Sequence, residues 1–181
     1  MRRDLPRAYP GMKIGLFGGS FDPAHEGHAH VAETALKRMQ LDRVWWLVAP
    51  QNPLKQRSSP FEQRFASALA HAHGPRMAVS DFEKRFSCAY TYDTLRELKR
   101  RYPGVGFVLL LGEDNLASFQ RWKRWREVAR AVPVAVVSRP GARPAGRLSA
   151  PEGWIFISAR HHPQSSTEAR RRLAVAKRRG K

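Results

Sequence analysis

Two histidines, His25 and His28, follow a glycine-rich turn near the start of the chain, where residues 18–28 read GGSFDPAHEGH. An apolar run that ends in Gly18 and Gly19 leaves backbone N–H groups open to an anion, and the positive end of the following helix faces the same space. This arrangement predicts a phosphate site. When a phosphorus atom is attacked in line, charge grows on its oxygens, and imidazoles that donate hydrogen bonds stabilise that charge without a covalent intermediate. We therefore rank His28 first among the catalytic candidates.

The same histidine pair is a weak candidate for a metal site. A structural zinc ion requires a third and a fourth ligand, and Cys88 is the only cysteine in the chain. We therefore expect the protein itself to hold no metal. Because a single thiol also excludes a disulfide within the chain, the sequence favours a reducing compartment and a packing role for Cys88.

A second candidate phosphate site lies near the end of the chain, where residues 163–172 read PQSSTEARRR. The S-x-x-E spacing at residues 165–168 is that of a capping box, which predicts that a helix begins there. Ser166 and Thr167 would then offer N–H groups and hydroxyls at the helix end, with Arg170 one turn further on. A capping box alone indicates only the start of a helix, but the hydroxyls and the guanidinium together favour β- and γ-phosphates as the ligand.

Two further segments supply candidate ligand contacts. Residues 45–55 read WWLVAPQNPLK, so a strand leads into a proline-rich loop at the carboxyl edge of the expected sheet, and Lys55 projects from that loop. Lys55 is either a phosphate contact or a solvated surface lysine. Further along, Trp122 offers a ring face that can stack on a cationic ring, whereas Trp125, at helical spacing, is better explained as a core residue.

These residues need a scaffold, and the pattern of apolar runs predicts one. Six short apolar runs alternate with segments of helical pattern; the runs are residues 13–17, 43–48, 77–80, 105–111, 132–138 and 154–158. In the first helical segment the apolar residues recur on one face, at Ala32, Ala35, Leu36 and Met39. The sequence therefore predicts an α/β fold, a Rossmann-like parallel sheet of five or six strands with helices on both faces.

Basic residues dominate the charge, with 33 Lys and Arg against 15 Asp and Glu and a net charge of +18. Such a surface attracts small phosphorylated substrates, nucleic acid or acidic lipid, and the charge alone does not choose between them. No apolar run approaches the roughly 20 residues that span a bilayer, and the first residues lack an apolar signal core. The sequence thus predicts a cytoplasmic protein without membrane contact, and it leaves the oligomeric state open.

Five segments in order along residues 13–173 resemble the nicotinate mononucleotide adenylyltransferase family of the H-x-G-H nucleotidyltransferase superfamily. The first is GGSFDPAHEGH, and the last is similar to the family's I-S-S-T-x-x-R signature. Between them lie a P-x-N-P-x-K loop that ends in Lys55, the segment YTYDTL, and the segment GEDNL followed by F-x-x-W-x-x-W. The chain departs from the family pattern at four positions, Ala89, Glu113, Gln164 and Ala169.

The resemblance implies transfer of AMP from ATP to nicotinate mononucleotide, giving deamido-NAD and pyrophosphate, with Mg²⁺ held by the phosphates of ATP. The catalytic residues that it implies are His25, His28, Lys55 and Arg170. For ATP, the implied contacts are Gly18, Gly19, Ser20, Phe21, His28, Asp114, Ser166, Thr167 and Arg170. For nicotinate mononucleotide, they are Ser20, Lys55, Tyr90, Thr91 and Trp122. Glu113, where the family often carries a small residue, could crowd or recharge the adenosine pocket, and the sequence leaves that effect open.

Two groups of alternatives stay open. Within the superfamily, the acceptor is nicotinamide mononucleotide or another phosphorylated compound such as phosphopantetheine, or CMP is transferred to a phosphorylated alcohol. The segments at residues 90–95 and 114–122 argue against the acceptors other than pyridine mononucleotides. From a different class, a basic nucleic-acid-binding protein would show steeply salt-dependent affinity, but the chain lacks a recognisable base-reading module, so only non-specific charge attraction is expected.

The chain is long enough for one compact domain. We expect residues 1–12 to form a flexible basic leader, residues 13–176 a single nucleotidyltransferase domain, and residues 177–181 a basic tail. The stretch at residues 139–153 is rich in Pro, Gly and Ala and predicts a surface loop between two strands.

Overall fold

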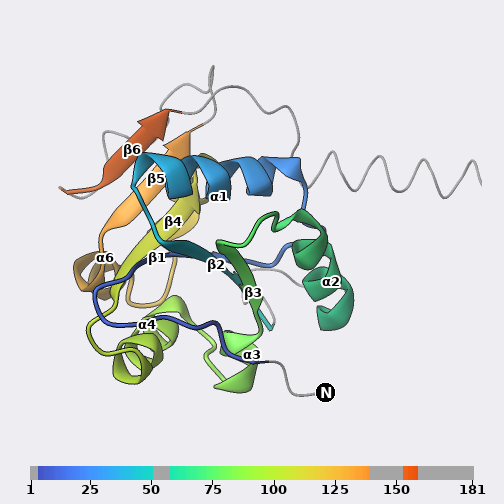
Figure 1. The fold of residues 1–181 in the computed structure, drawn as a ribbon, viewed down its shortest axis with the longest axis horizontal. Coiled ribbons are helices and arrows are strands. Elements are labelled where there is room, and N and C mark those ends of the chain that lie inside the picture. The colour runs from blue at the N-terminus through green and yellow to red at the C-terminus, as the bar shows by residue number, and fades with distance from the viewer. Residues whose placement is uncertain (1–3, 51–57, 139–152, 159–181) are drawn as a thin grey trace, which may run out of the picture.

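The computed structural model describes residues 4–50, 58–138 and 153–158 of the chain. Within them, six parallel strands form one sheet in the order β3-β2-β1-β4-β5-β6 (Figure 1). The strands are β1 (Lys13–Gly19), β2 (Arg43–Val48), β3 (Met77–Ser80), β4 (Gly106–Gly112), β5 (Val134–Ser138) and β6 (Ile155–Ser158). The helices are α1 (Glu26–Arg38), α2 (Phe61–His71), α3 (Phe82–Arg85), α4 (Thr91–Arg101), α5 (Glu113–Phe119) and α6 (Trp125–Ala131). The predicted fold class is confirmed.

Helices cover both faces of the sheet, and each face has its own apolar core. α1 and α2 pack on one face, whereas α3, α4, α5 and α6 contribute to the core on the other (Figure 1). Neighbouring residues of a strand point to opposite faces, so Trp45 belongs to one core and Trp46 to the other, and both are fully buried. This two-sided burial explains why the central strands are almost continuously apolar.

The six predicted strands are all present, with small shifts at their ends. β1 runs two residues beyond the predicted end, because Gly18 and Gly19 still pair with Leu47 and Val48 of β2. The first helix buries the predicted stripe, with Ala32 and Ala35 inaccessible to solvent.

The order of the strands determines where a ligand can bind. The chain moves outward from β1 through β2 to β3, then returns to the other side of β1 with β4. In such open parallel sheets, the loops after β1 and β4 leave in opposite directions, and a crevice opens at the carboxyl ends of those two strands. The glycine-rich turn after β1 and the segment after β4 therefore border the same space.

Residues 4–12 lie against the domain, where the sequence predicted a flexible leader. Leu5 and Ala8 pack against the apolar core to which α4 contributes, and the hydroxyl of Tyr102 donates a hydrogen bond to the backbone carbonyl of Pro6 at 3.0 Å. The apolar positions of this segment carry too little pattern to predict that contact, because its partners lie more than 90 residues away in sequence. Among the described residues, no helix is long and apolar enough to cross a membrane.

Candidate active site

A cavity of about 360 Å³ opens at the carboxyl edge of the sheet. Its floor is formed by the ends of β1 and β4, and its walls by the first turns of α1 and α4 and by residues 112–123. The cavity therefore lies where the strand order predicts a ligand site.

Every predicted site residue that the structure describes lines this cavity: Gly18, Gly19, Ser20, Phe21, His25, His28, Tyr90, Thr91, Asp114 and Trp122. They come from segments separated by up to 100 residues, so the fold brings together what the sequence motifs only suggested. The other four predicted residues, Lys55, Ser166, Thr167 and Arg170, lie outside the described residues, and their roles stay predictions.

The two histidines are held at the start of α1 by the helix terminus itself. The backbone N–H of His25 donates a hydrogen bond to Nδ1 of His28 at 3.2 Å. A nitrogen that accepts this bond carries no proton, so we infer that neutral His28 holds its proton on Nε2. The ring centroids of His25 and His28 are 3.8 Å apart, which fixes the two imidazoles relative to each other. His28 is thus prepared to donate a hydrogen bond from Nε2.

The glycine-rich turn is shaped by close packing around Phe21. Phe21 adopts a left-handed backbone conformation (φ 46°), and its buried ring packs on Trp46 and on His28. A Cβ on Gly19 would lie only 3.0 Å from that ring, whereas a Cβ on Gly18 would meet no atom within 4 Å. A side chain at position 19 would therefore press on the Phe21 ring, whereas Gly18 leaves backbone open toward the cavity.

The opposite wall begins with Tyr90 and Thr91 at the N-terminus of α4, behind which lies a buried carboxyl. The hydroxyl of Thr94 donates a hydrogen bond to Oε1 of Glu83 at 2.9 Å, and both residues border the cavity. Burial raises the pKa of Glu83 to about 7, and the bond from Thr94 partly opposes that rise. The sequence reasoning missed Glu83, because a single glutamate in a short helix carries no motif.

The tryptophans behave as the spacing suggested. Trp122 lines the cavity, while the partly buried Trp125 packs against the core with its ring centroid 6.2 Å from that of Phe119. Two basic side chains that flank Trp122, Arg121 and Lys123, also border the cavity and were not predicted. Their position beside Trp122 was the available signal. Asp114 borders the cavity, and its neighbour Glu113 is not among the lining residues.

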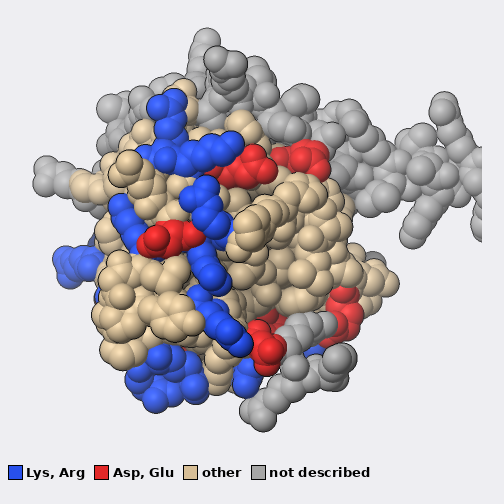
Figure 2. Space-filling view, in the orientation of Figure 1, with Lys and Arg blue, Asp and Glu red and all other residues tan. Residues whose placement is uncertain are grey.

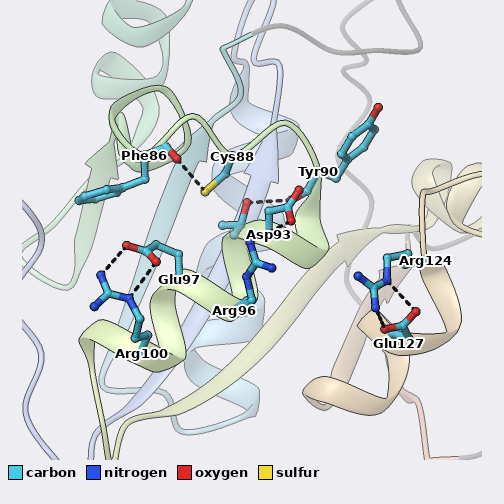
Figure 3. Close-up of polar contacts among 10 residues, drawn as sticks. Phe86, Cys88, Tyr90, Asp93, Arg96, Glu97, Arg100, Arg124 and Glu127 are labelled. Carbon is cyan, nitrogen blue, oxygen red and sulfur yellow. Dashed lines mark hydrogen bonds and ion pairs between the residues drawn. The ribbon is translucent and has the colours of Figure 1, made fainter.

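Aromatic faces and ion pairs fix the wall that carries these residues. The Lys123 ammonium lies 4.4 Å from the centroid of the Tyr90 ring, and the Arg124 guanidinium lies 3.8 Å from that of Tyr92. Arg124 also pairs with Glu127, as Figure 3 shows. The segment that carries Trp122 is thereby joined to the start of α4 across the mouth of the cavity.

Cys88 and Glu97 are structural rather than reactive. Cys88 is buried, and its thiol donates a weak hydrogen bond to the carbonyl of Phe86 (Figure 3). Burial raises the pKa of Cys88 to about 11, so the predicted packing role holds. Glu97 accepts bonds from Arg100 and Arg101 on α4, and the Arg100 bond is the main reason that its pKa falls to about 2.

Lys and Arg side chains form a band across the face of the molecule shown in Figure 2, and a few acidic side chains lie beside them. In the part of the chain that the structure describes, no three His, Cys, Asp or Glu side chains gather to hold a metal ion. The expectation that Mg²⁺ is held by ATP phosphates stays a prediction.

Comparison with known proteins identifies the family. A cytidylyltransferase-like family model matches residues 16–172. The probable nicotinate-nucleotide adenylyltransferase of Roseobacter denitrificans is 52% identical over 161 residues, covering 88% of this chain and 80% of the relative. That of a Caulobacter species is 55% identical over 151 residues, covering 82% and 79%.

A solved structure shares the fold at low sequence identity. The Plasmodium falciparum nicotinic acid mononucleotide adenylyltransferase complexed with NaAD superposes with a TM-score of 0.72 at 19% identity, over 88% of this chain and 83% of the other. The motifs, the strand order and the curated relatives agree, and the chain belongs to the nicotinate-nucleotide adenylyltransferase family.

Proposed function

We propose that this protein transfers AMP from MgATP to nicotinate mononucleotide. An oxygen of the mononucleotide phosphate attacks the α-phosphorus of ATP, the bond from that phosphorus to the bridging oxygen of the β-phosphate breaks, and pyrophosphate leaves. Membership of the family supports the reaction. The observation that carries it for this chain is the placement of His28, with a donor Nε2, beside the open backbone of Gly18 in one cavity.

The proposed mechanism needs position and positive charge more than covalent chemistry. The backbone at Gly18 approaches the phosphates closely, and His28 donates a hydrogen bond to the oxygens on which charge develops. His25 holds Nδ1 of His28 through its backbone N–H and so keeps the proton on Nε2. Lys55, Ser166, Thr167 and Arg170 are proposed as further phosphate contacts. Mg²⁺ is proposed to enter with ATP and to offset charge on its phosphates.

The pyridine ring of the acceptor is proposed to stack on Trp122, with its carboxylate toward Tyr90 and Thr91. The first turn of α4 offers backbone N–H groups and the positive end of the helix, which favour a carboxylate over an amide. Arg121 and Lys123 add positive charge on the same side of the cavity. These features support the acid as the acceptor, and Asp114 is proposed to lie on the adenosine side.

A pyrophosphate-release assay tests the acceptor directly. The protein is supplied with ATP and Mg²⁺ and, in parallel, with nicotinate mononucleotide, nicotinamide mononucleotide or phosphopantetheine. We expect strong preference for the first. Preference for either of the other acceptors contradicts the assignment of Tyr90, Thr91 and Trp122 to the pyridine ring. If none of the three acceptors leads to pyrophosphate release and the protein binds nucleic acid in a salt-dependent way, a nucleic-acid-binding protein is favoured.

A matched pair of variants tests the stacking. Base stacking on an aromatic side chain is worth about 1–3 kcal/mol, so Trp122→Ala should lower kcat/KM for the acceptor by about 5- to 150-fold while KM for ATP stays constant. Trp125→Phe, in the same segment but away from the cavity, should leave both values near those of the wild type. Equal effects of the two variants would contradict the stacking role.

A further inference from the structure

One buried guanidinium lies behind the wall of the cavity rather than in it. Arg64 on α2 is 2% exposed and does not line the cavity. Its side chain donates hydrogen bonds to four backbone carbonyls, at 2.9 Å to Ser59, 2.8 Å to Ser20, 2.8 Å to Ala49 and 2.7 Å to Pro50. A charged group of this size is rarely buried without such a set of partners.

The four carbonyls belong to two loops that meet at the site. Ser20 lies in the turn after β1 and Ala49 directly follows β2, and both border the cavity. These two loops leave neighbouring parallel strands, and one main-chain hydrogen bond, from the Ala49 N–H to the Gly19 carbonyl at 3.0 Å, continues the pairing. Arg64 joins the two loops one step beyond that bond, at the carbonyls of Ser20 and Ala49.

Two more polar residues on the same face of α2 contact the turn before His25 and the first residue of α1. Ser67 accepts a hydrogen bond from the Ala24 N–H at 2.9 Å, and Nε2 of His71 lies 3.8 Å from a carboxylate oxygen of Glu26. Arg64, Ser67 and His71 are spaced i, i+3 and i+7, so they form one stripe along the helix. We call these three residues the α2 brace.

We propose that the α2 brace positions the phosphate-binding turn, with Arg64 as its main positioning residue. By holding the carbonyl of Ser20, Arg64 fixes the peptide group between Ser20 and Phe21, and with it the end of the turn that begins at Gly18. This inference deepens the proposed function and rests on it. Arg64 touches no substrate, and it acts only through the backbone.

The chemistry of the side chain explains why arginine is required there. A guanidinium is planar and directs its N–H groups along fixed directions, so it can reach carbonyls on two loops at once, whereas an ammonium is a compact point charge. Burial lowers the pKa of Arg64 from its usual value, and the nearby Asp22 carboxylate opposes that effect. Asp22 also accepts a hydrogen bond from the Ser59 N–H at 3.2 Å, so the turn and the start of α2 are tied from both directions.

Arg64→Lys tests the proposal, because it keeps the positive charge but lacks the planar set of N–H donors that reaches the four carbonyls. The matched control is Ala68→Gly. Ala68 is fully buried in the same helix, and its replacement by glycine weakens α2 without removing a polar contact to the turn. For each variant we would measure the melting temperature, Kd for ATP by calorimetry, kcat and KM, and amide hydrogen exchange of the peptide covering residues 18–24.

We expect Arg64→Lys to raise Kd for ATP at least tenfold and to speed exchange at residues 18–24. Ala68→Gly should lower the melting temperature yet leave both values within about twofold of the wild type, the size of ordinary context effects. If the two variants lose ATP affinity equally at equal melting temperature, Arg64 is merely structural and the proposal is overturned.

Two further comparisons test the proposal when Arg64→Lys does not fold or when the acceptor is not nicotinate mononucleotide. If Arg64→Lys does not fold, Ser67→Ala is measured instead, because it removes a single hydrogen bond to the turn. Faster amide exchange at residues 18–24 together with weaker ATP binding supports the role of the α2 brace. Exchange and ATP binding equal to those of the wild type overturn it. If the wild type binds ATP but gives no product with nicotinate mononucleotide, the proposed acceptor is wrong. The amide exchange rates and ATP affinities of the variants still test the role of the α2 brace, because they do not depend on the acceptor.

Discussion

Replacing Gly18 with alanine should separate nucleotide binding from folding. The new methyl group would meet no atom of the protein within 4 Å, and Gly18 does not adopt a left-handed conformation. The protein should therefore fold normally, and loss of backbone freedom in the unfolded chain should even add about 0.4–1 kcal/mol to stability.

The same methyl group occupies space that a phosphate oxygen needs to reach the backbone. A hydrogen bond to a charged group contributes about 1.5–3 kcal/mol, so loss of one such bond should raise Kd for ATP by about 10- to 150-fold. Calorimetry with ATP, together with a thermal melt of the same sample, measures both quantities. An unchanged Kd at an unchanged melting temperature would refute the close approach of phosphate to Gly18.

Gly15→Ala provides the opposite control on the same strand. There a Cβ would lie 2.7 Å from Cδ1 of Leu41 and 2.8 Å from Cδ1 of Leu110, both in the packed core. Overpacking of this kind costs about 1–3 kcal/mol, which lowers the melting temperature by several degrees in a protein of this size. The affinity of the folded variant for ATP should be unchanged.

Three further predictions concern side chains of the site and its support. His28→Ala should lower kcat about a hundredfold or more while thermal unfolding is unchanged, and a loss of less than tenfold would remove His28 from the mechanism. The folded-state pKa of Glu83, about 7, lies above the usual 4.5, so its ionisation destabilises the folded protein as the pH rises from 5 to 8. Glu83→Gln should not lose this stability, so at pH 8 its free energy of unfolding in urea should exceed that of the wild type by up to about 3 kcal/mol. If the free energies of unfolding of the two proteins depend on pH in the same way, the burial of Glu83 is contradicted. The Cys88 thiol should react slowly with a disulfide reagent at pH 8 and rapidly in urea; a fast reaction of the native protein would show that the thiol is accessible.

The scaffold was predictable because its signals are local. Apolar runs buried on both faces mark parallel strands, and the stripe at Ala32 and Ala35 marks the face of α1 that packs on the sheet. Of the cavity-lining residues, His25 and His28 were indicated by the glycine-rich turn that precedes them, whereas Tyr90, Thr91, Asp114 and Trp122 followed from the resemblance of their segments to the family. Each feature can be read from a few neighbouring residues.

Arg64, Glu83 and the segment at residues 4–12 were not predictable, since their roles depend on distant partners. The carbonyl of Ser20 that Arg64 binds is 44 residues away, and a buried arginine has the same sequence pattern as a solvated one on an amphipathic helix. The environment of Glu83 depends on Thr94 of α4, which is 11 residues away in sequence. In each case tertiary packing, rather than local pattern, gives the residue its environment.

The central position of β1 in the sheet has a consequence for biosynthesis. β2 is made soon after β1 and can pair with it at once, but the partner on the other side, β4, begins about 90 residues after β1 ends. At about 5–20 residues per second, a growing chain would leave that edge of β1 unpaired for roughly 5–20 s. During this interval an apolar strand exposes its N–H and C=O groups, which is the condition under which chains associate wrongly. β1, which carries Gly18 and Gly19, is thus a strand that waits long for its second partner while the chain is being made.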